Sequence, residues 1–448
     1  MTFTKNSATL LSEQSIKEYY YDIKNQDSIG EGVTFEILKR FVKQYNEYKL
    51  ENDKMDYTDM LEQVLKKRLI PNVKVLFVDE FQDFSRIQYL IYEMWRDACE
   101  KVYICGDDFQ CIYEFNGADS SFFLNTYADH KIILPKTYRL PSNHLKLSNN
   151  LIQSVKHKQL KNITSVKDYK GIINYIDVEE QGMNKIMDMI KKDMKYYNNT
   201  CNECKHEYVS KVKQTCPLCN SKHIEREKLR ISFLFRAKYQ AIEFIEYLNE
   251  LGIIFQGRFS FWDEETINIY NGLYKIKHNL KLNNAEIRDV LLLLPSTQFL
   301  IWGTKTELKD EETIEKDKIF IDIKKQHFSL QEKDCDLDRV IYALQLDNKI
   351  KKGLLRSLEK NVPIIKTPKD IPLIVETMHN FKGEESDINF VFLNITMKVE
   401  DGILNTSDGL DNEKRLFYVA ITRQKRKLVL VDNFINNRSF LEYSNIKV

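Results

Sequence analysis

Short apolar runs of strand length, each followed at once by polar residues, constrain the fold of this 448-residue chain most strongly. VKVLFV at 73–78 shows no alternation of apolar and polar residues, which is typical of a parallel strand covered on both faces. KVYICGDD at 101–108 and KIILP at 131–135 predict two further strands. Between the first two lies a predicted helix with one apolar stripe, at Ile87, Leu90, Ile91, Met94 and Trp95. The pattern indicates an open α/β sheet, and such sheets bind ligands at the carboxyl ends of their strands.

A second α/β region follows. Its predicted strands are 171–177, 231–235, 372–377, 388–395 and 427–432. Residues 240–252 predict a helix that stops at Gly252. The first 70 residues and the highly charged stretch 262–365 have apolar residues at helical spacing and few strand signals, so we expect both to be mostly helical.

Composition narrows the class of protein only slightly. The formal net charge is +1, so the overall balance does not identify a partner. No apolar run approaches membrane-spanning length, and the first residues lack the basic-then-apolar pattern of a signal peptide, so we expect a cytoplasmic protein. Four of the eight cysteines lie in one short segment, which argues against a disulfide framework.

Asp79 and Glu80 follow directly after the first predicted strand. In nucleotide hydrolases a carboxylate at this place holds Mg²⁺, and a neighbouring Glu orients or deprotonates the attacking water. For an isolated Asp-Glu pair, two solvated loop acids would be the better interpretation. The segments that accompany the pair favour the catalytic one.

Five segments occur in order: DEFQD (79–83), GDDFQCIYEFNGA (106–118), LPKTYRLP (134–141), TMHNFKGEESDINFV (377–391) and EKRLFYVAITRQK (413–425). They closely resemble motifs II to VI of UvrD/Rep-type superfamily 1 helicases. MDYTDML (55–61) and FLFRAKYQA (233–241) are similar to the segments before motif II and between motifs IV and V. The resemblance covers about residues 35–435, apart from one insertion. It implies an α/β fold with two RecA-like parallel-sheet domains, ATP between them and single-stranded DNA across both, with movement typically 3′ to 5′.

The resemblance also implies the domain organisation. Residues 1–135 would be the later part of the first RecA-like domain, which is N-terminally incomplete. Residues 136–261 and 366–448 would form the second, UvrD-like C-terminal domain. We expect a zinc ribbon at 195–226 and a helical, 2B-like insertion at 262–365.

For ATP hydrolysis the resemblance implies catalytic roles for Asp79, as the Mg²⁺ carboxylate, and for Glu80, Gln110, Arg139 and Arg423. Gln110 would couple the nucleotide to DNA. The two arginines would stabilise the charge of the phosphoryl-transfer transition state, for which a planar, permanently charged guanidinium is suited.

Tyr138 would bind the nucleotide by stacking on adenine, and Glu385 by accepting hydrogen bonds from the ribose. The Lys382-Gly383 pair would place backbone against phosphate. Glu413 and Arg415 would belong to an ion network in motif VI. Glu384 stands where the family commonly has Leu.

Tyr113, Phe115 and His379 would contact DNA. Phe115 stands where the family usually has Trp, and an aromatic face can stack on any base. Simple core packing is the alternative for Phe115. Asn116 replaces the Arg often found beside this aromatic residue.

CNECKHEYVSKVKQTCPLC contains two CxxC pairs, Cys201 with Cys204 and Cys216 with Cys219, separated by eleven residues. This spacing strongly predicts a structural zinc ribbon with no open coordination position. His206 and His223 are substitute ligands if one cysteine does not bind. The neighbouring lysines, which could meet phosphate but more often form a solvated face, are Lys205, Lys211, Lys213 and Lys222.

The sequence contains no G-x-x-x-x-G-K-[ST], the loop that cradles ATP phosphates. WGTKTE (302–307) has similar letters in the wrong arrangement. We therefore expect an ATP- and Mg²⁺-dependent DNA helicase polypeptide that needs an N-terminal segment or protein partner carrying this loop, and whose incomplete sheet exposes apolar surface. A split gene and a truncated or misassigned start both fit. The alternative is a non-hydrolysing, DNA-binding relic, which the retained catalytic set disfavours.

Overall fold

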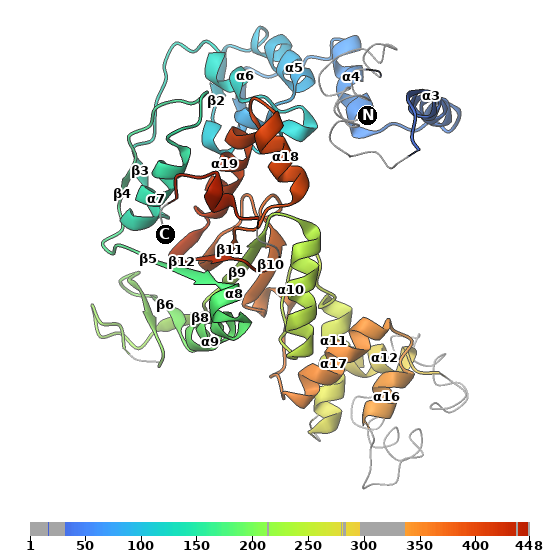
Figure 1. Ribbon diagram of the computed structural model, residues 1–448, viewed down its shortest axis with the longest axis vertical. Helices are drawn as coiled ribbons and strands as arrows, with labels where there is room; N and C mark the ends of the chain where they lie inside the picture. Colours follow the sequence, from blue (N-terminus) through green and yellow to red (C-terminus); the bar gives the residue numbers. More distant parts are fainter. Residues whose placement is uncertain are drawn as a thin grey trace. The chain divides into compact units, whose positions relative to one another are not determined.

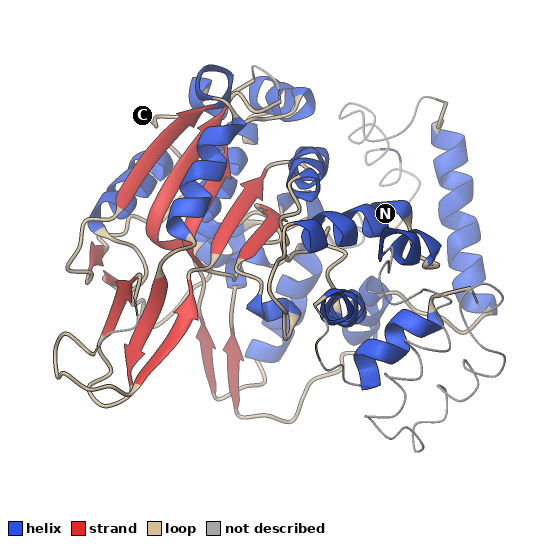
Figure 2. Cartoon of the chain, turned by 90° about the horizontal axis from the view of Figure 1, so that it is seen from below, coloured by secondary structure: helices blue, strands red, loops and turns tan. Residues whose placement is uncertain are grey.

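The structure is a computed structural model that describes residue 17 and residues 32–212, 215–278, 280, 284–295, 337–435 and 438–446. The described chain combines helices with parallel sheets, and the predicted α/β fold class is confirmed (Figures 1 and 2). The chain divides into two compact units. The first unit comprises Met1–Gly182, Met378–Glu385 and Val391–Val448, and the second comprises Met183–Thr377 and Ser386–Phe390. The domain boundaries expected from the motifs stay a prediction.

The described N-terminal part of the first unit is helical. Thr34 caps the N-terminus of helix α3 (Phe35–Glu51). Asp56 caps that of helix α4 (Tyr57–Lys66), and its side chain forms a capping box with Asp59. The buried Lys49 ties the two helices together, because its ammonium group lies 2.9 Å from Asp56 and 2.5 Å from Asp59.

Strands β1 (Val75–Val78) and β2 (Lys101–Ile104) form a two-stranded parallel sheet, with Val75 opposite Lys101. Side chains on one face, including Leu76 and Val102, are half-buried. On the other face Phe77 is 75% exposed and Tyr103 is 51% exposed, and their rings stack at 4.9 Å. The elements around this sheet are η1 (Phe81–Asp83), α5 (Arg86–Arg96), η2 (Asp108–Gln110), η3 (Glu114–Asn116) and α6 (Ser120–Asn125).

The third predicted strand, KIILP at 131–135, is wrong. These residues are irregular, with Ile132 83% and Leu134 78% exposed. The nearest strand is β3 (Lys136–Thr137), which pairs in parallel with β4 (Thr164–Ser165) and is followed by α7 (Ser142–Ile152). An apolar run becomes a strand only when a neighbour satisfies its backbone groups, and no strand in the described residues pairs with this run.

The largest sheet has the strand order β10 (Leu373–Thr377), β9 (Ile231–Phe235), β11 (Ser386–Phe392), β12 (Gln424–Asp432), β5 (Ile172–Asp177). All five correspond to strands predicted from the sequence. β12 and β5 run parallel, as do β10 and β9. Helix α8 (Val178–Gln181) follows β5 and packs against it. Near the other strands in the sequence are α18 (Met397–Asn405), α19 (Gly409–Ala420) and the short turns η5 (Pro368–Asp370) and η6 (Phe440–Glu442).

In the second unit α9 (Met183–Asp193) leads into a small antiparallel sheet, with the order β7 (Glu207–Ser210), β6 (Tyr197–Cys201), β8 (Ile224–Lys228). Helix α10 (Lys238–Glu250) packs beside β9 and β10 (Figure 1). It ends at Glu250, two residues before the predicted stop at Gly252, which has a positive φ of 67°. A Cβ there would also lie 2.6 Å from the carbonyl oxygen of Arg356, so only glycine fits.

The predicted helical stretch 262–365 is helical where it is described. Helices α11 (Glu264–Lys277), α12 (Asn284–Leu292), α16 (Leu337–Ala343) and α17 (Asn348–Glu359) share a core that includes Tyr270 and Leu354. WGTKTE (302–307) and Lys213 lie outside the described residues. Within the described parts of the chain, no helix is both long and apolar enough to cross a membrane.

Candidate functional site

Asp79 and Glu80 lie at the carboxyl end of β1, and both are exposed. The backbone N–H of Glu80 donates to Oδ1 of Asp79 at 2.9 Å. Glu80 adopts a left-handed conformation with φ of 52°, which is uncommon for a residue with a side chain and is concentrated at functional sites. The chain therefore turns sharply where the sequence predicts the catalytic carboxylates.

The buried side chain of Gln82 joins this turn to the loop after β2. Its amide nitrogen donates to Oε2 of Glu80 at 2.5 Å, and its oxygen accepts from the backbone N–H of Asp107 at 2.8 Å. A Cβ on Gly106 would collide with the Gln82 oxygen, so a larger residue there would displace this amide. Motifs II and III are thus fixed against each other by one glutamine.

Gln110 continues the chain of hydrogen bonds into motif VI. Its amide nitrogen donates to Asp107 at 2.7 Å, and its side-chain oxygen accepts from Nη2 of Arg423 at 3.0 Å. Arg423 is buried three residues after the end of α19, and its Nε also donates to the carbonyl oxygen of Val419. Burial, together with the nearby charge of Arg139, lowers the pKa of Arg423 to about 10, so the guanidinium remains charged at pH 7.

Arg139 binds the carboxylate of Glu385. Its Nε donates to Oε1 at 2.7 Å and its Nη2 donates to the same oxygen, while Lys425 lies 3.1 Å from Oε2. Burial by itself raises the pKa of Glu385, but the hydrogen bonds and charges of Arg139 and Lys425 bring that pKa below its ordinary value. The predicted transition-state arginine and the predicted ribose ligand are therefore bound to each other.

The other two predicted nucleotide-binding residues are open to solvent. The ring of Tyr138 is largely exposed. Gly383 has φ of 88°, and no heavy atom lies within 4 Å of where its Cβ would be. An exposed ring and an open backbone are both accessible to a ligand.

The side chain of Lys382 belongs to the site, although the sequence suggested a role only for its backbone. Its side chain is almost buried, forms an ion pair with Asp83, lies 3.8 Å from Glu80 and donates to the carbonyl oxygen of Gln110 at 2.7 Å. Burial raises the pKa of Asp83, and the hydrogen bond and charge of Lys382 oppose that rise. A lysine before a glycine carries no sequence signal for this arrangement.

Arg415 supports the motif III loop, in line with the predicted ion network. Nε donates to the carbonyl oxygen of Asp108 at 3.2 Å, and Nη2 donates to that of His157 at 2.9 Å. Glu114 lies 4.0 Å from Nη1 of Arg415. Burial raises the pKa of Glu114 to about 7, although Arg415 opposes the shift. Glu413 is buried in the same helix, α19.

The three predicted DNA contacts lie together. The ring of Phe115 meets the ring of His379 edge-on at 5.6 Å and that of Tyr113 at 6.1 Å. The core-packing alternative for Phe115 is wrong, because its side chain is 61% exposed. An exposed aromatic residue between two other rings offers a stacking surface for a base.

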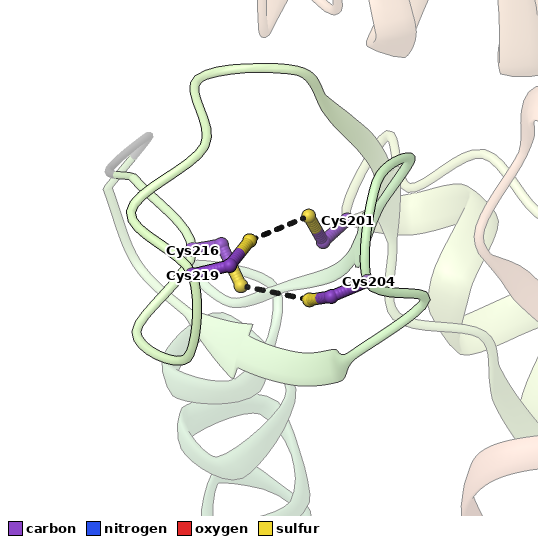
Figure 3. A group of neighbouring side chains, drawn as sticks. All are labelled: Cys201, Cys204, Cys216 and Cys219. Carbon is purple, nitrogen blue, oxygen red and sulfur yellow. Dashed lines mark hydrogen bonds between the residues drawn. The ribbon is translucent and has the colours of Figure 1, made fainter.

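The four cysteines of the ribbon converge (Figure 3). Their Sγ atoms all lie within 4.8 Å of one another, with Cys201 to Cys219 at 3.5 Å and Cys204 to Cys216 at 3.6 Å. Four sulfurs about 2.3 Å from a central zinc ion would be about 3.8 Å apart, so the cluster fits tetrahedral zinc. His206 stacks on Tyr208, and His223 pairs with Glu203, so neither substitute ligand belongs to the cluster.

The two CxxC turns have the same backbone structure. Lys205 and Asn220, each directly after the second cysteine of its turn, both have φ of 57°. Their N–H groups donate to the carbonyl oxygens of Cys201 and Cys216, both at 2.9 Å. Matched left-handed turns that direct two thiols each to one point are the geometry of paired metal-binding knuckles.

Comparison with protein families agrees with this arrangement. The model of the UvrD/Rep helicase N-terminal domain matches residues 2–131, and the model of the UvrD-like helicase C-terminal domain matches residues 304–433. This chain belongs to the UvrD/Rep family of superfamily 1 helicases. The expected fold class, two RecA-like domains of this family, is accordingly confirmed.

Curated UvrD/Rep relatives are similar over most of the chain. An ATP-dependent DNA helicase Rep from Buchnera aphidicola subsp. Schizaphis graminum is 24% identical over 87% of the chain and 67% of the relative. A probable DNA helicase II homolog from Mycoplasma pneumoniae is 24% identical over 87% of the chain and 59% of the relative. Another probable DNA helicase II homolog, from Mycoplasma genitalium, is 24% identical over 97% of the chain and 67% of the relative. The chain thus spans about two thirds, or less, of the length of these relatives.

Proposed function

We propose that this UvrD/Rep-family chain carries motifs II to VI of an ATP-driven DNA helicase or translocase of 3′ to 5′ polarity, and that its phosphate-binding loop comes from polypeptide outside these 448 residues. The observation that carries the proposal is the continuous set of hydrogen bonds from Glu80 through Gln82, Asp107 and Gln110 to Arg423. It links three motifs that are useful together for hydrolysing a nucleoside triphosphate.

The residues around this network fit ATP and Mg²⁺. Asp79 offers an exposed carboxylate for Mg²⁺, and Glu80 is placed beside it to orient the attacking water. Arg423 and Arg139 supply permanent positive charge for the transferred phosphoryl group. In this proposal Glu385 exchanges its ion pair with Arg139 for the ribose hydroxyls, which frees Arg139 to bind phosphate.

The exposed rings of Phe115 and Tyr138 fit the two stacking partners that a DNA motor has, a base of single-stranded DNA and the adenine of ATP. Phe115 lies beside His379 of motif V. Motif V also contains Lys382, which binds the backbone of Gln110. This gives a short covalent and hydrogen-bonded route between the proposed DNA contact and the nucleotide site.

The bare face of the β1–β2 sheet supports the need for a further segment. Parallel sheets are normally covered on both faces, and two strands alone are too few to be stable. The exposed, stacked Phe77 and Tyr103 lie on that face, next to the carboxyl ends where Asp79 and Glu80 follow. A strand, phosphate-binding loop and helix from another segment or a partner protein would extend this sheet and cover these rings.

We also propose that Cys201, Cys204, Cys216 and Cys219 hold one structural zinc ion. Four thiols would fill the tetrahedral coordination of zinc, so the ion would supply folding energy and leave no open position for a reacting molecule. Cytoplasmic location, where thiols stay reduced, remains a prediction in line with this proposal.

The test is ATP hydrolysis stimulated by single-stranded DNA. The chain is mixed with the product of the reading frame upstream of the Met1 codon if that frame encodes a glycine-lysine loop, and a copy whose loop lysine is replaced by alanine is the control. Activity that requires both polypeptides and the loop lysine supports the proposal. Tight DNA binding with no hydrolysis in any mixture supports the second candidate, a non-hydrolysing DNA-binding module, for which the exposed Phe115–His379 pair is sufficient.

A further inference from the structure

The ribbon that contains the four cysteines is joined closely to the rest of the second unit. Strand β8 ends at Lys228, and only Leu229 and Arg230 separate it from β9 of the large sheet. Leu229 is buried, so this connection is part of the packed structure and does not act as a loose tether. The ribbon is therefore held at its C-terminal side by the strand that follows.

A second attachment is made by side chains. Nδ2 of Asn198, in β6, donates to both carboxylate oxygens of Asp387, at 3.0 and 2.9 Å. Asp387 is buried, and its Oδ2 also accepts from the backbone N–H of Arg230 at 2.9 Å. In return, the backbone N–H groups of Asp387 and Ile388 donate to the carbonyl oxygen of Arg230. A buried carboxylate needs such donors, so Asn198 stabilises the position of Asp387.

Asp387 is the second residue of β11 and lies within motif V, two residues after Glu385. The ribbon strand that carries Asn198 ends at Cys201, one of the four clustered cysteines. Asn198 is thus three residues from a metal-binding cysteine, and its partner is two residues from the predicted ribose ligand.

From these contacts we propose that the zinc ribbon is a metal-dependent brace for motif V, with Asn198 as the positioning residue. Small ribbons of this kind have little core of their own, so their folding depends on the metal. With zinc bound, β6 holds Asn198 against Asp387 and the start of β11 is fixed. Without zinc, β6 loses its support and Asp387 loses two of its hydrogen bonds. The inference rests on the zinc site proposed above and does not require ATP hydrolysis.

Hydrogen exchange of the full chain, read by mass spectrometry, tests the brace directly. Removing zinc with a chelator, or replacing Asn198 in N198A, should make the amides of 386–392 exchange about tenfold faster, the effect of losing hydrogen bonds to a charged group. The matched control is N202A, because Asn202 has an exposed side chain in the same ribbon. If exchange in 195–228 accelerates on chelation while that in 386–392 does not change, the brace is overturned.

Zinc affinity gives an independent measurement, since coupling between two sites is reciprocal. D387A should weaken zinc binding about tenfold in competition with a chromophoric chelator. The zinc affinity of D387A tests the brace even if N198A fails to fold. Unchanged zinc affinity in D387A contradicts the brace but leaves the zinc site intact, whereas a wild-type chain that binds no zinc overturns both.

Discussion

Nη2 of Arg423 donates a 3.0 Å hydrogen bond to the side-chain oxygen of Gln110, although the two residues are 313 positions apart in the chain. The amide nitrogen of Gln110 donates to the side chain of Asp107. The backbone N–H of Asp107 donates in turn to Gln82, which lies close to the predicted catalytic carboxylates. Gln110 therefore links the end of α19 to the loop after β2. A movement of either element relative to the other would break or stretch this hydrogen bond.

R423A should reduce DNA-stimulated ATP hydrolysis of the chain mixed with the polypeptide that carries the phosphate-binding loop. The expected reduction is about a thousandfold or more, the usual effect of losing an arginine that stabilises a phosphoryl-transfer transition state. R423K should restore little activity, because lysine keeps the charge but lacks the planar fork. The matched control is R96A, an exposed arginine paired with Asp97. Equal activity in R423A and R96A would contradict the assignment.

K382M should destabilise the first unit at pH 7.5, since it leaves the partly buried Asp83 without its ion-pair partner, a change that typically costs about 3 kcal/mol. Burial already raises the pKa of Asp83. Removing the lysine raises that pKa further, so the loss of stability should shrink as the pH falls and Asp83 takes up a proton. Thermal midpoints at pH 5 and pH 7.5 measure the difference. The double variant K382M/D83N should recover most of the loss.

E114Q should remove a pH dependence of stability between about pH 5 and pH 8. Oε1 of Glu114 is buried without a hydrogen-bond partner, and burial raises the pKa of Glu114 to about 7. A carboxyl group whose folded pKa is raised stabilises the fold fully below its unfolded pKa and loses that contribution as the pH rises through the folded pKa. The wild-type thermal midpoint should therefore fall over this range, and that of E114Q should fall by less. A parallel fall in both proteins would rule Glu114 out as its source.

F115A should weaken binding of single-stranded DNA about tenfold or more, the usual result of losing one base-stacking side chain. F115W should bind at least as well as the wild type, since tryptophan offers a larger ring. Y127A, which removes another exposed aromatic ring, is the control and should leave affinity unchanged. Fluorescence anisotropy with a labelled oligonucleotide measures each affinity without requiring ATP hydrolysis.

The wild-type chain should contain one zinc ion per molecule by native mass spectrometry, and C216S should lose it. The exchange protection of 195–228 should fall with the metal, while the backbone amides around Gln110 and Arg423, which lie in the other unit, should keep their protection. Full zinc content in C216S would defeat the four-cysteine assignment.

The sequence predicted the parts of the fold that depend on local patterns. Continuous apolar runs correctly predicted the five strands of the largest sheet, and the CxxC spacing predicted a cluster that the structure forms with sulfurs 3.5 and 3.6 Å apart. KIILP at 131–135 has the same pattern and is not a strand. A strand needs a neighbour as well as an apolar pattern, and only the tertiary structure determines whether a neighbour is present.

Contacts across the site show the same limit. Motif resemblance picked out Gln110, Arg423, Arg139 and Glu385, and the structure joins them in two hydrogen-bonded groups. The resemblance did not reveal the ion pair between Lys382 and Asp83, or the hydrogen bond from Asn198 to Asp387. In each pair the two residues are far apart in sequence. Neither the lysine nor the asparagine lies in a sequence pattern that would predict its partner.

The uncovered ring pair of Phe77 and Tyr103 has a consequence for the life of the protein in a cell. If a further segment covers these rings, as proposed above, a newly made chain would expose them to chaperones and proteases until that segment binds. Its abundance would then follow the supply of the covering segment, so that surplus copies are destroyed and the two parts are kept in equal number without any dedicated regulator.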